Sequence, residues 1–152
     1  MERKAVGAVI LVDSDKLIVV EKQTIETVNG KVYRAPEIDF VKGGVQAKER
    51  LEEALFRELY EETGSDAYEP VAAIEQPLTF TFPIKVAKQI GFLTQKTYFY
   101  IVAFQGRLDE LLANDEEIKA IHVIKREDIM NHLTHSETKD YYETYLVNFV
   151  RS

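Results

Sequence analysis

One stretch of the chain, GGVQAKERLEEALFRELYEETG at residues 43–64, constrains the fold more than any other. Its spacing predicts a helix over residues 48–63, ended by the closing glycine. On a helix that advances about 100° per residue, Glu58, Glu61 and Glu62 share one face, which apolar residues continue in the two preceding turns. The three acids therefore lie on the stripe that should point into the protein.

Carboxylates on an inward face are costly unless their charge is cancelled. These acids also crowd the C-terminal half of the predicted helix, where the macrodipole disfavours further negative charge. Within the cluster, Arg57 is one cation against several acids. A hard divalent cation would balance them, because Mg²⁺ and Mn²⁺ prefer carboxylate oxygens. The alternative is a solvated charged face, the usual fate of a charge run on a helix.

The stretch resembles the signature of the Nudix hydrolases. That signature reads Gly, five residues, Glu, seven residues, Arg-Glu, an aliphatic residue, any residue, Glu-Glu, any residue, Gly and an aliphatic residue. The chain matches it at Gly43, Glu49, Arg57, Glu58, Leu59, Glu61, Glu62 and Gly64. Ser65 departs from it, since the family usually has a hydrophobic residue there. A match at so many fixed positions favours a metal site over a solvated face.

The resemblance implies an α/β fold, a Nudix-type α/β/α sandwich with a mixed β-sheet between helices. It also implies Mg²⁺- or Mn²⁺-dependent hydrolysis of a nucleoside diphosphate linked to another moiety. By resemblance, Glu61 and Glu62 are the expected direct metal ligands, and Glu58 is a ligand or the base. A support role is expected for Glu49 and Arg57, in which Arg57 pairs with the acids and fixes their rotamers.

Further metal ligands are expected outside the three acids. A backbone carbonyl at the bend of Gly43 and Gly44 is one of them. Many Nudix relatives also use an acid from outside the signature, and here Glu116 and Glu117 stand just before the last predicted strand. The alternative for these two acids is a solvated acidic loop.

Length and composition favour one domain over residues 1–152, with 45% hydrophobic and 30% charged residues. No apolar run is long enough to span a bilayer, and no leader peptide is recognisable at the charged start. The absence of cysteine excludes disulfides and thiolate zinc sites. We therefore expect a cytoplasmic protein without membrane contact, as a monomer or a homodimer.

The order of elements supports a mixed sheet. We predict a hairpin of strands 5–12 and 16–21, an exposed polar loop over 23–31 with a turn at Asn29 and Gly30, an irregular or edge segment over 33–41 and a loop over 84–93. Further strands are predicted at 71–76, 79–82, 97–104 and 118–124, a short helical turn or loop at 108–113, and helices at 127–133 and 139–150. Of these, the apolar run TYFYIVAF, residues 97–104, is the expected central strand.

Three weaker motifs indicate the substrate. Residues 3–7 (RKAVG), 40–44 (FVKGG) and 91–99 (GFLTQKTYF) are similar to motifs of the RNA pyrophosphohydrolases of the Nudix family. The resemblance implies a dinucleoside polyphosphate or a 5′-triphosphorylated RNA end as substrate.

A net charge of −7 repels polyanions, so such a substrate needs a local basic patch or bound cations. Arg3, Lys42 and Lys96 are the candidate phosphate ligands, and Tyr98 is a candidate for stacking on a base. The alternatives are ordinary surface lysines and core packing of the tyrosine.

Other readings stay open. One is a MutT-type nucleoside triphosphate hydrolase or an ADP-ribose or sugar-nucleotide pyrophosphatase. Another is a non-catalytic nucleotide-sensing module, although such modules typically lose signature acids. His122, His132 and His135 have no ligand partners at metal spacing and are expected at the surface.

Overall fold

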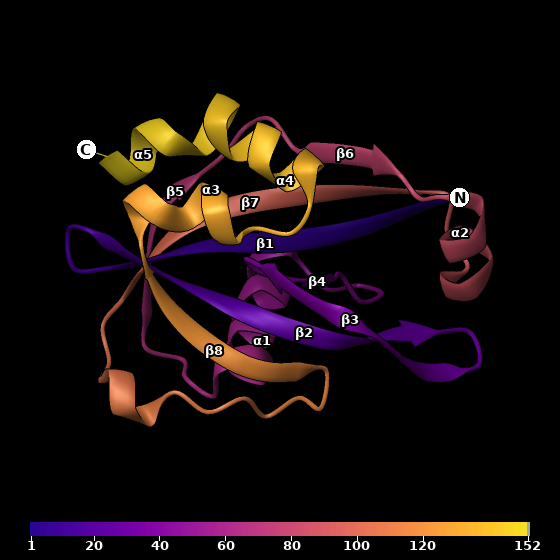
Figure 1. Ribbon diagram of the computed structural model, residues 1–152, viewed down its shortest axis with the longest axis horizontal. Coiled ribbons are helices and arrows are strands. Elements are labelled where there is room, and N and C mark those ends of the chain that lie inside the picture. Colours follow the sequence, from indigo (N-terminus) through magenta and orange to yellow (C-terminus); the bar gives the residue numbers. More distant parts are fainter. Residues whose placement is uncertain (152) are drawn as a thin grey trace.

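The computed structural model describes residues 1–151, apart from the side chains of Glu26 and Arg151, and forms one mixed eight-stranded sheet flanked by helices (Figure 1). The strands are β1 (Glu2–Val12), β2 (Lys16–Thr27), β3 (Gly30–Asp39), β4 (Val41–Gly44), β5 (Tyr68–Ala73), β6 (Leu78–Thr81), β7 (Thr94–Phe104) and β8 (Ile118–Lys125). The helices are α1 (Leu51–Thr63), α2 (Ile84–Ile90), α3 (Ile129–His132), α4 (Ser136–Tyr141) and α5 (Val147–Arg151). A π-helical segment, η3 (Tyr142–Leu146), joins α4 to α5, and η1 (Leu108–Glu110) and η2 (Arg126–Asp128) are 3₁₀ turns.

Two parallel strands form the middle of the sheet. β1 pairs with β7 from Glu2 opposite Thr94 to Leu11 opposite Ala103, and every other strand pairing is antiparallel. The central order is β3-β2-β1-β7-β5, with β4 on β1, β6 on β7 and β8 on β2. The prediction that the run around 97–104 is a central strand is therefore confirmed.

Alternation along β1 divides the core into two layers. Val6 and Ala8 belong to a cluster that includes Leu55 of α1, whereas Val9 belongs to a second cluster with Phe99 and Leu146. Helix α1 and the C-terminal segment α4–α5 thus cover opposite faces of the sheet (Figure 1). This is the expected α/β/α sandwich.

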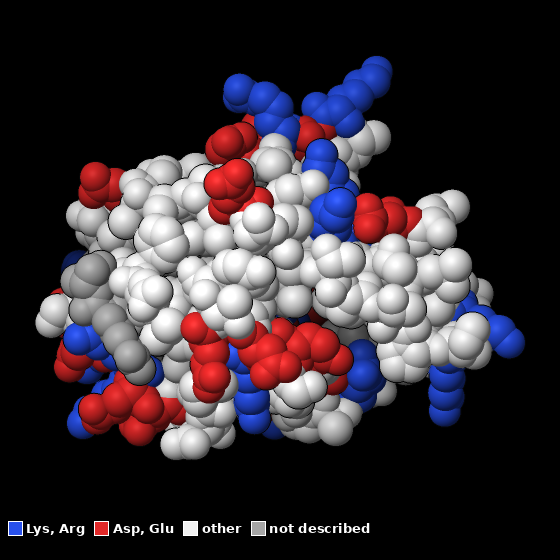
Figure 2. All heavy atoms as spheres, turned by 90° about the horizontal axis from the view of Figure 1, so that it is seen from above, with Lys and Arg blue, Asp and Glu red and all other residues white. Residues whose placement is uncertain are grey.

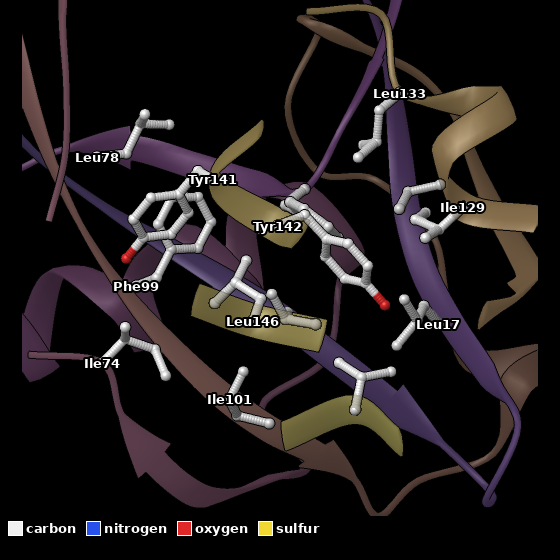
Figure 3. Packing of buried hydrophobic residues seen from close by; sticks show 14 of the residues in the cluster. Leu17, Ile74, Leu78, Phe99, Ile101, Ile129, Leu133, Tyr141, Tyr142 and Leu146 are labelled. Atoms are coloured by element: carbon white, nitrogen blue, oxygen red, sulfur yellow. The ribbon is translucent and has the colours of Figure 1, made fainter. Parts of the chain in front are cut away.

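Aromatic rings fix the C-terminal segment on its face of the sheet. Tyr141 lies with its ring centroid 5.0 Å from that of Phe99, and Tyr142 stacks on Phe40 at 5.9 Å. Figure 3 shows both tyrosines pointing into the cluster from the helical segment, beside Leu146. The predicted terminal helix is thus present, with the π-helical segment η3 in its middle.

Two predicted loops are wrong. Residues 23–31 are not an exposed loop, because β2 and β3 continue into a hairpin with Thr27 opposite Gly30, although the turn predicted at Asn29 and Gly30 lies at the tip of this hairpin. Gly30 adopts φ +105°, the conformation that a tight turn requires. The alternation of apolar and polar residues is weak in that stretch, because most residues of β3 are exposed. This exposure agrees with the edge segment predicted for residues 33–41.

The second wrong loop, residues 84–93, contains helix α2. Pro83 precedes its first turn, and Gly91 ends it with φ +84°. Seven residues are too few for a helical period to stand out in the sequence.

The boundaries of α1 differ slightly from the prediction. The helix begins at Leu51 rather than 48, because Lys48 adopts φ +66° and the Glu53 side chain reaches back to accept a hydrogen bond from the Arg50 N–H at 3.0 Å. Past its end, Ser65 is buried, and its hydroxyl accepts a hydrogen bond from the Ala67 N–H at 3.1 Å. None of the helices within residues 1–151 is both long and apolar enough to cross a membrane.

Candidate active site

Helix α1 carries two of its three signature acids into the protein. Leu55 and Leu59 are buried against the sheet, and the same face continues to Glu58, 8% exposed, and Glu62, 2% exposed. The Glu61 side chain is 40% exposed and lies at the rim. The sequence predicted all three acids on the inward face, whereas the structure places Glu58 and Glu62 inside and Glu61 at the edge.

Strand β4 lets the Glu58 carboxyl approach its backbone closely. A Cβ built on Gly43 would lie 1.9 Å from Glu58 Cδ and 2.2 and 2.3 Å from its two carboxylate oxygens. No side chain fits in that space. Gly43 is thus a glycine because the carboxyl occupies the position of its side chain.

Arg57 joins the acids to the loop before α1. Its Nε and Nη2 donate to Glu49 Oε2 at 2.8 Å and Oε1 at 3.0 Å, and Nη2 also donates to the Gly44 carbonyl at 2.8 Å. Nη1 lies 2.8 Å from Glu58 Oε1 and 3.3 Å from Glu61 Oε2. Its hydrogen bond with Glu49 raises the pKa of Arg57 and lowers that of Glu49.

Lys22, which was not among the predicted site residues, faces the buried end of the acidic cluster. Its Nζ lies 3.6 Å from Glu62 Oε1 and donates to the Lys42 carbonyl at 3.3 Å. Strand alternation could have indicated it, because Lys22 follows Ile18 and Val20 on the side of β2 that faces α1. The strand predicted over residues 16–21 ended one residue before Lys22. Arg57 is therefore not the one cation beside these acids.

Burial perturbs the site's titrating groups. It raises the pKa of Glu62 well above its ordinary value, Lys22 partly offsets this, and Glu58 adds to it. Burial, and next the charge of Glu58, also raise the pKa of Glu61. For Lys22, burial alone would lower the pKa, but the charges of Glu62, Asp39 and other acids outweigh burial and raise it. Burial is thus the main cause of the raised carboxyl pKa values, and the neighbouring acids add to it.

Arg3 reaches the same site from β1. Its guanidinium lies over Gly44, where an added Cβ would be 2.7 Å from Nη2. Nη1 donates to Gln95 Oε1 at 2.7 Å, and Gln95 Nε2 donates to Thr97 Oγ1 at 3.0 Å, with both partners buried. Burial lowers the pKa of Arg3, although the Glu58 charge opposes this. The guanidinium is thus held in a fixed orientation beside the acids.

The structure places Lys42 on the opposite face of β4 from Glu58. Its Nζ lies 3.1 Å from Asp39 Oδ2, donates to Thr138 Oγ1 at 3.0 Å, and sits 5.6 Å from the Phe99 ring centroid. Lys42 therefore ties β4 to helix α4, and its charge is balanced by Asp39.

The other predicted substrate residues lie on β7. Tyr98 is half-buried against the cluster beneath α1, with Lys4 Nζ 5.8 Å from its ring centroid. Lys96 is half-buried opposite Thr79 of β6.

Of the two acids before β8, Glu117 lies nearer the cluster. Glu117 is half-buried, and burial, followed by the charge of Asp115, raises its pKa, with Lys22 and Glu58 also acting on it. Its carbonyl accepts a hydrogen bond from the Gln23 N–H at 3.3 Å, which ties the segment to β2. Glu116 is exposed.

Two histidines have carboxylate partners that the sequence did not reveal. His135 Nε2 lies 2.8 Å from Glu37 Oε2, and His122 Nε2 lies 3.0 Å from Glu21 Oε1. Each pair joins residues about one hundred positions apart, so no local pattern signals it.

The residues present fit a hard divalent cation. In the described part of the chain, no three acidic, histidine or cysteine side chains already enclose a metal position. Arg57 lies between Glu58 and Glu61, and Lys22 faces Glu62. Glu62 Oε1 is nevertheless buried without a hydrogen-bond partner among the residues that the structure describes. An unsatisfied buried carboxylate oxygen beside a second carboxyl is the donor chemistry that Mg²⁺ and Mn²⁺ prefer.

Known proteins resemble this chain in sequence and in fold. The NUDIX domain family model matches residues 1–145. An RNA pyrophosphohydrolase of a Nitratiruptor species is 30% identical over 98 residues, which span 62% of this chain and 63% of that protein.

Solved structures resemble the fold over nearly its whole length. The dihydroneopterin triphosphate pyrophosphohydrolase of E. coli superimposes with a TM-score of 0.69 at 13% identity, covering 95% of each chain. An Ap4A hydrolase of C. elegans, solved as a binary complex, gives a TM-score of 0.67 at 15% identity, covering 93% of each chain. At such identities the likeness establishes the fold alone.

Proposed function

The chain belongs to the Nudix family, and on that premise we propose that it is a pyrophosphohydrolase that uses Mg²⁺ or Mn²⁺ to cleave a phosphoanhydride bond of a nucleoside polyphosphate. The observation that carries the proposal is the buried pair Glu58 and Glu62, with one Glu62 oxygen left without a hydrogen bond. Burying two carboxyls together costs free energy, and a divalent cation bound to them would offset that cost.

Glu58, Glu61 and Glu62 would hold the cation, with the Gly43 carbonyl and Glu117 as further oxygen donors. When bound, the cation neutralises charge on the phosphate oxygens and activates water for in-line attack. Glu61, at the rim, is the signature acid most open to solvent, so it has room to contact an incoming phosphate-bound ion.

The other residues position the acids and the substrate. Arg57 holds Glu49, Glu58 and the Gly44 carbonyl in one network, which fixes the Glu58 rotamer. Arg3, oriented by Gln95, presents guanidinium donors for phosphate oxygens next to the acids.

For the substrate class, we favour a dinucleoside polyphosphate or a 5′-triphosphorylated RNA end. The supporting observations are the N-terminal motif that carries Arg3 and the similarity to a relative named RNA pyrophosphohydrolase. Figure 2 shows acidic side chains gathered on the face above the C-terminal helices, without a continuous basic stripe. Contact with RNA on that face is therefore unfavourable.

A turnover panel tests the proposal. The protein is incubated with Mg²⁺ or Mn²⁺ and with diadenosine tetraphosphate, triphosphorylated RNA, nucleoside triphosphates, ADP-ribose and sugar nucleotides, and each product is identified. Turnover of the first two supports the favoured class. Turnover of only the others indicates a MutT-type or ADP-ribose pyrophosphatase.

The matched control is Glu62→Gln, which keeps the shape of the side chain and removes its charge. We expect it to lower kcat by several orders of magnitude, and excess chelator should abolish turnover of the wild type. A wild type that binds nucleotides but turns over none of the panel would instead be a sensing module, and the proposal would fail.

A further inference from the structure

Lys22 is a half-buried charged group that the proposed reaction does not use. It follows Ile18 and Val20 on the α1-facing side of β2, and its side chain is 21% exposed. The acids that act on it come from several elements: Glu58 and Glu62 from α1, Asp39 from β3, and Glu117 from the segment before β8. Lys22 is therefore a cation on which acids from three parts of the chain act, with Glu62 in direct contact.

The contact between Lys22 and Glu62 is an ion pair without a hydrogen bond. The two atoms are 3.6 Å apart, and Glu62 Oε1 has no hydrogen-bond partner, whereas Lys22 Nζ donates to the Lys42 carbonyl at 3.3 Å. A buried pair that serves stability alone is expected to satisfy its oxygens with short hydrogen bonds. Here the lysine balances the charge of the carboxylate but does not occupy Glu62 Oε1 with a hydrogen bond, so that this oxygen can still bind a metal ion.

We propose that Lys22 is a built-in counterion for Glu62. In the metal-free protein the lysine holds the pair of carboxylates in place, and its charge weakens the binding of the divalent cation that would take over this role. The inference rests on the proposed function, since it concerns the same acids. When a divalent cation binds, the ammonium is left a short distance from a like charge, and Lys22 then keeps only its bond to the Lys42 carbonyl. Removing its charge should therefore tighten metal binding, although it removes a favourable contact from the metal-free protein.

The test measures metal binding directly. Mn²⁺ affinity is determined by electron paramagnetic resonance, and the midpoint of thermal unfolding is measured in chelator and in saturating Mg²⁺. For Lys22→Met we expect a lower midpoint in chelator, a larger stabilisation by Mg²⁺, and Mn²⁺ binding tighter by about tenfold, the effect of one like charge at close range.

Three further variants separate charge from structure. Lys22→Gln keeps a hydrogen-bond donor without the charge and should tighten Mn²⁺ binding as Lys22→Met does. Lys22→Arg keeps the charge and should bind Mn²⁺ no more tightly than the wild type. Lys16→Met removes a lysine from the other end of β2 and should change neither quantity. If Lys22→Met folds only with Mn²⁺, the counterion role is supported. The Mn²⁺ affinity is then measured on Lys22→Gln in place of Lys22→Met.

Unchanged or weaker Mn²⁺ binding in both Lys22→Met and Lys22→Gln would overturn the inference, even if the unfolding midpoint falls. A higher KM with unchanged Mn²⁺ affinity would likewise overturn it, because Lys22 would then be a substrate ligand. Failure of the proposed function has a different signature. In that case the wild type and Glu62→Gln would bind Mn²⁺ equally, whatever stands at position 22.

Discussion

The sharpest prediction concerns Gly43→Ala, because the Glu58 carboxyl occupies the space that a side chain at position 43 would need. The new Cβ would lie 1.9 Å from Glu58 Cδ, whereas ordinary contact begins at 3.4 Å, so the carboxyl must move by about 1.5 Å. The backbone at Gly43 is not left-handed, so alanine itself adds no conformational strain. The whole effect should therefore act through Glu58.

Two magnitudes follow from that displacement. A misplacement of about 1 Å at a reacting centre costs roughly 10²-fold in rate, so kcat should fall by at least about 10²-fold. Overpacking of a filled site costs about 1–3 kcal/mol, which lowers the unfolding midpoint by a few degrees in a domain of this size. Steady-state kinetics with saturating Mg²⁺ and thermal unfolding in chelator measure the two quantities.

The matched control is Gly44→Ala, one residue along the same strand. Its Cβ would meet Arg3 Nη2 at 2.7 Å, the far end of a flexible side chain, so KM should rise while Mn²⁺ affinity is kept. The double variant Gly43→Ala/Glu58→Ala should recover most of the lost stability, because the clashing carboxyl is gone. A folded Gly43→Ala protein with wild-type kcat, or a double variant no more stable than additivity predicts, would refute the steric reasoning.

Three further predictions concern the groups around the acids. Arg57→Lys loses the forked contact with Glu49, so kcat should fall by about 10–100-fold, whereas Arg50→Lys, at an exposed pair, should leave kcat unchanged. Gln95→Leu removes the acceptor that orients Arg3, so KM for the polyphosphate should rise about tenfold with little change in kcat; equal losses in both would contradict a positioning role. The pKa of His135 is raised by its hydrogen bond to Glu37, so the charged pair stabilises the fold at about pH 6 and loses this effect as pH rises through the raised value. The difference in unfolding midpoint between wild type and His135→Gln should therefore shrink from about pH 6 to about pH 9, and a constant difference would exclude this linkage.

The amino-acid sequence by itself determined the local features of the site. The helical period placed Glu58 and Glu62 on the inward face of α1, and Gly64 ended the helix with φ +74°. Apolar runs located β1, β7 and β8, and the signature indicated the family. Each of these features depends on residues a few positions apart, the range over which helix and strand periods act.

Only the tertiary structure decided which cations meet those acids. Lys22 reaches Glu62 from β2, and Arg3 finds its acceptor Gln95 at a separation of 92 residues. Lys42, a predicted phosphate ligand, joins Asp39 and Thr138 across the other face of β4. These contacts follow from strand register and from which face each residue presents, and a shift of one residue would exchange the faces. Register is set by packing of the whole core, so no local pattern in the sequence contains it.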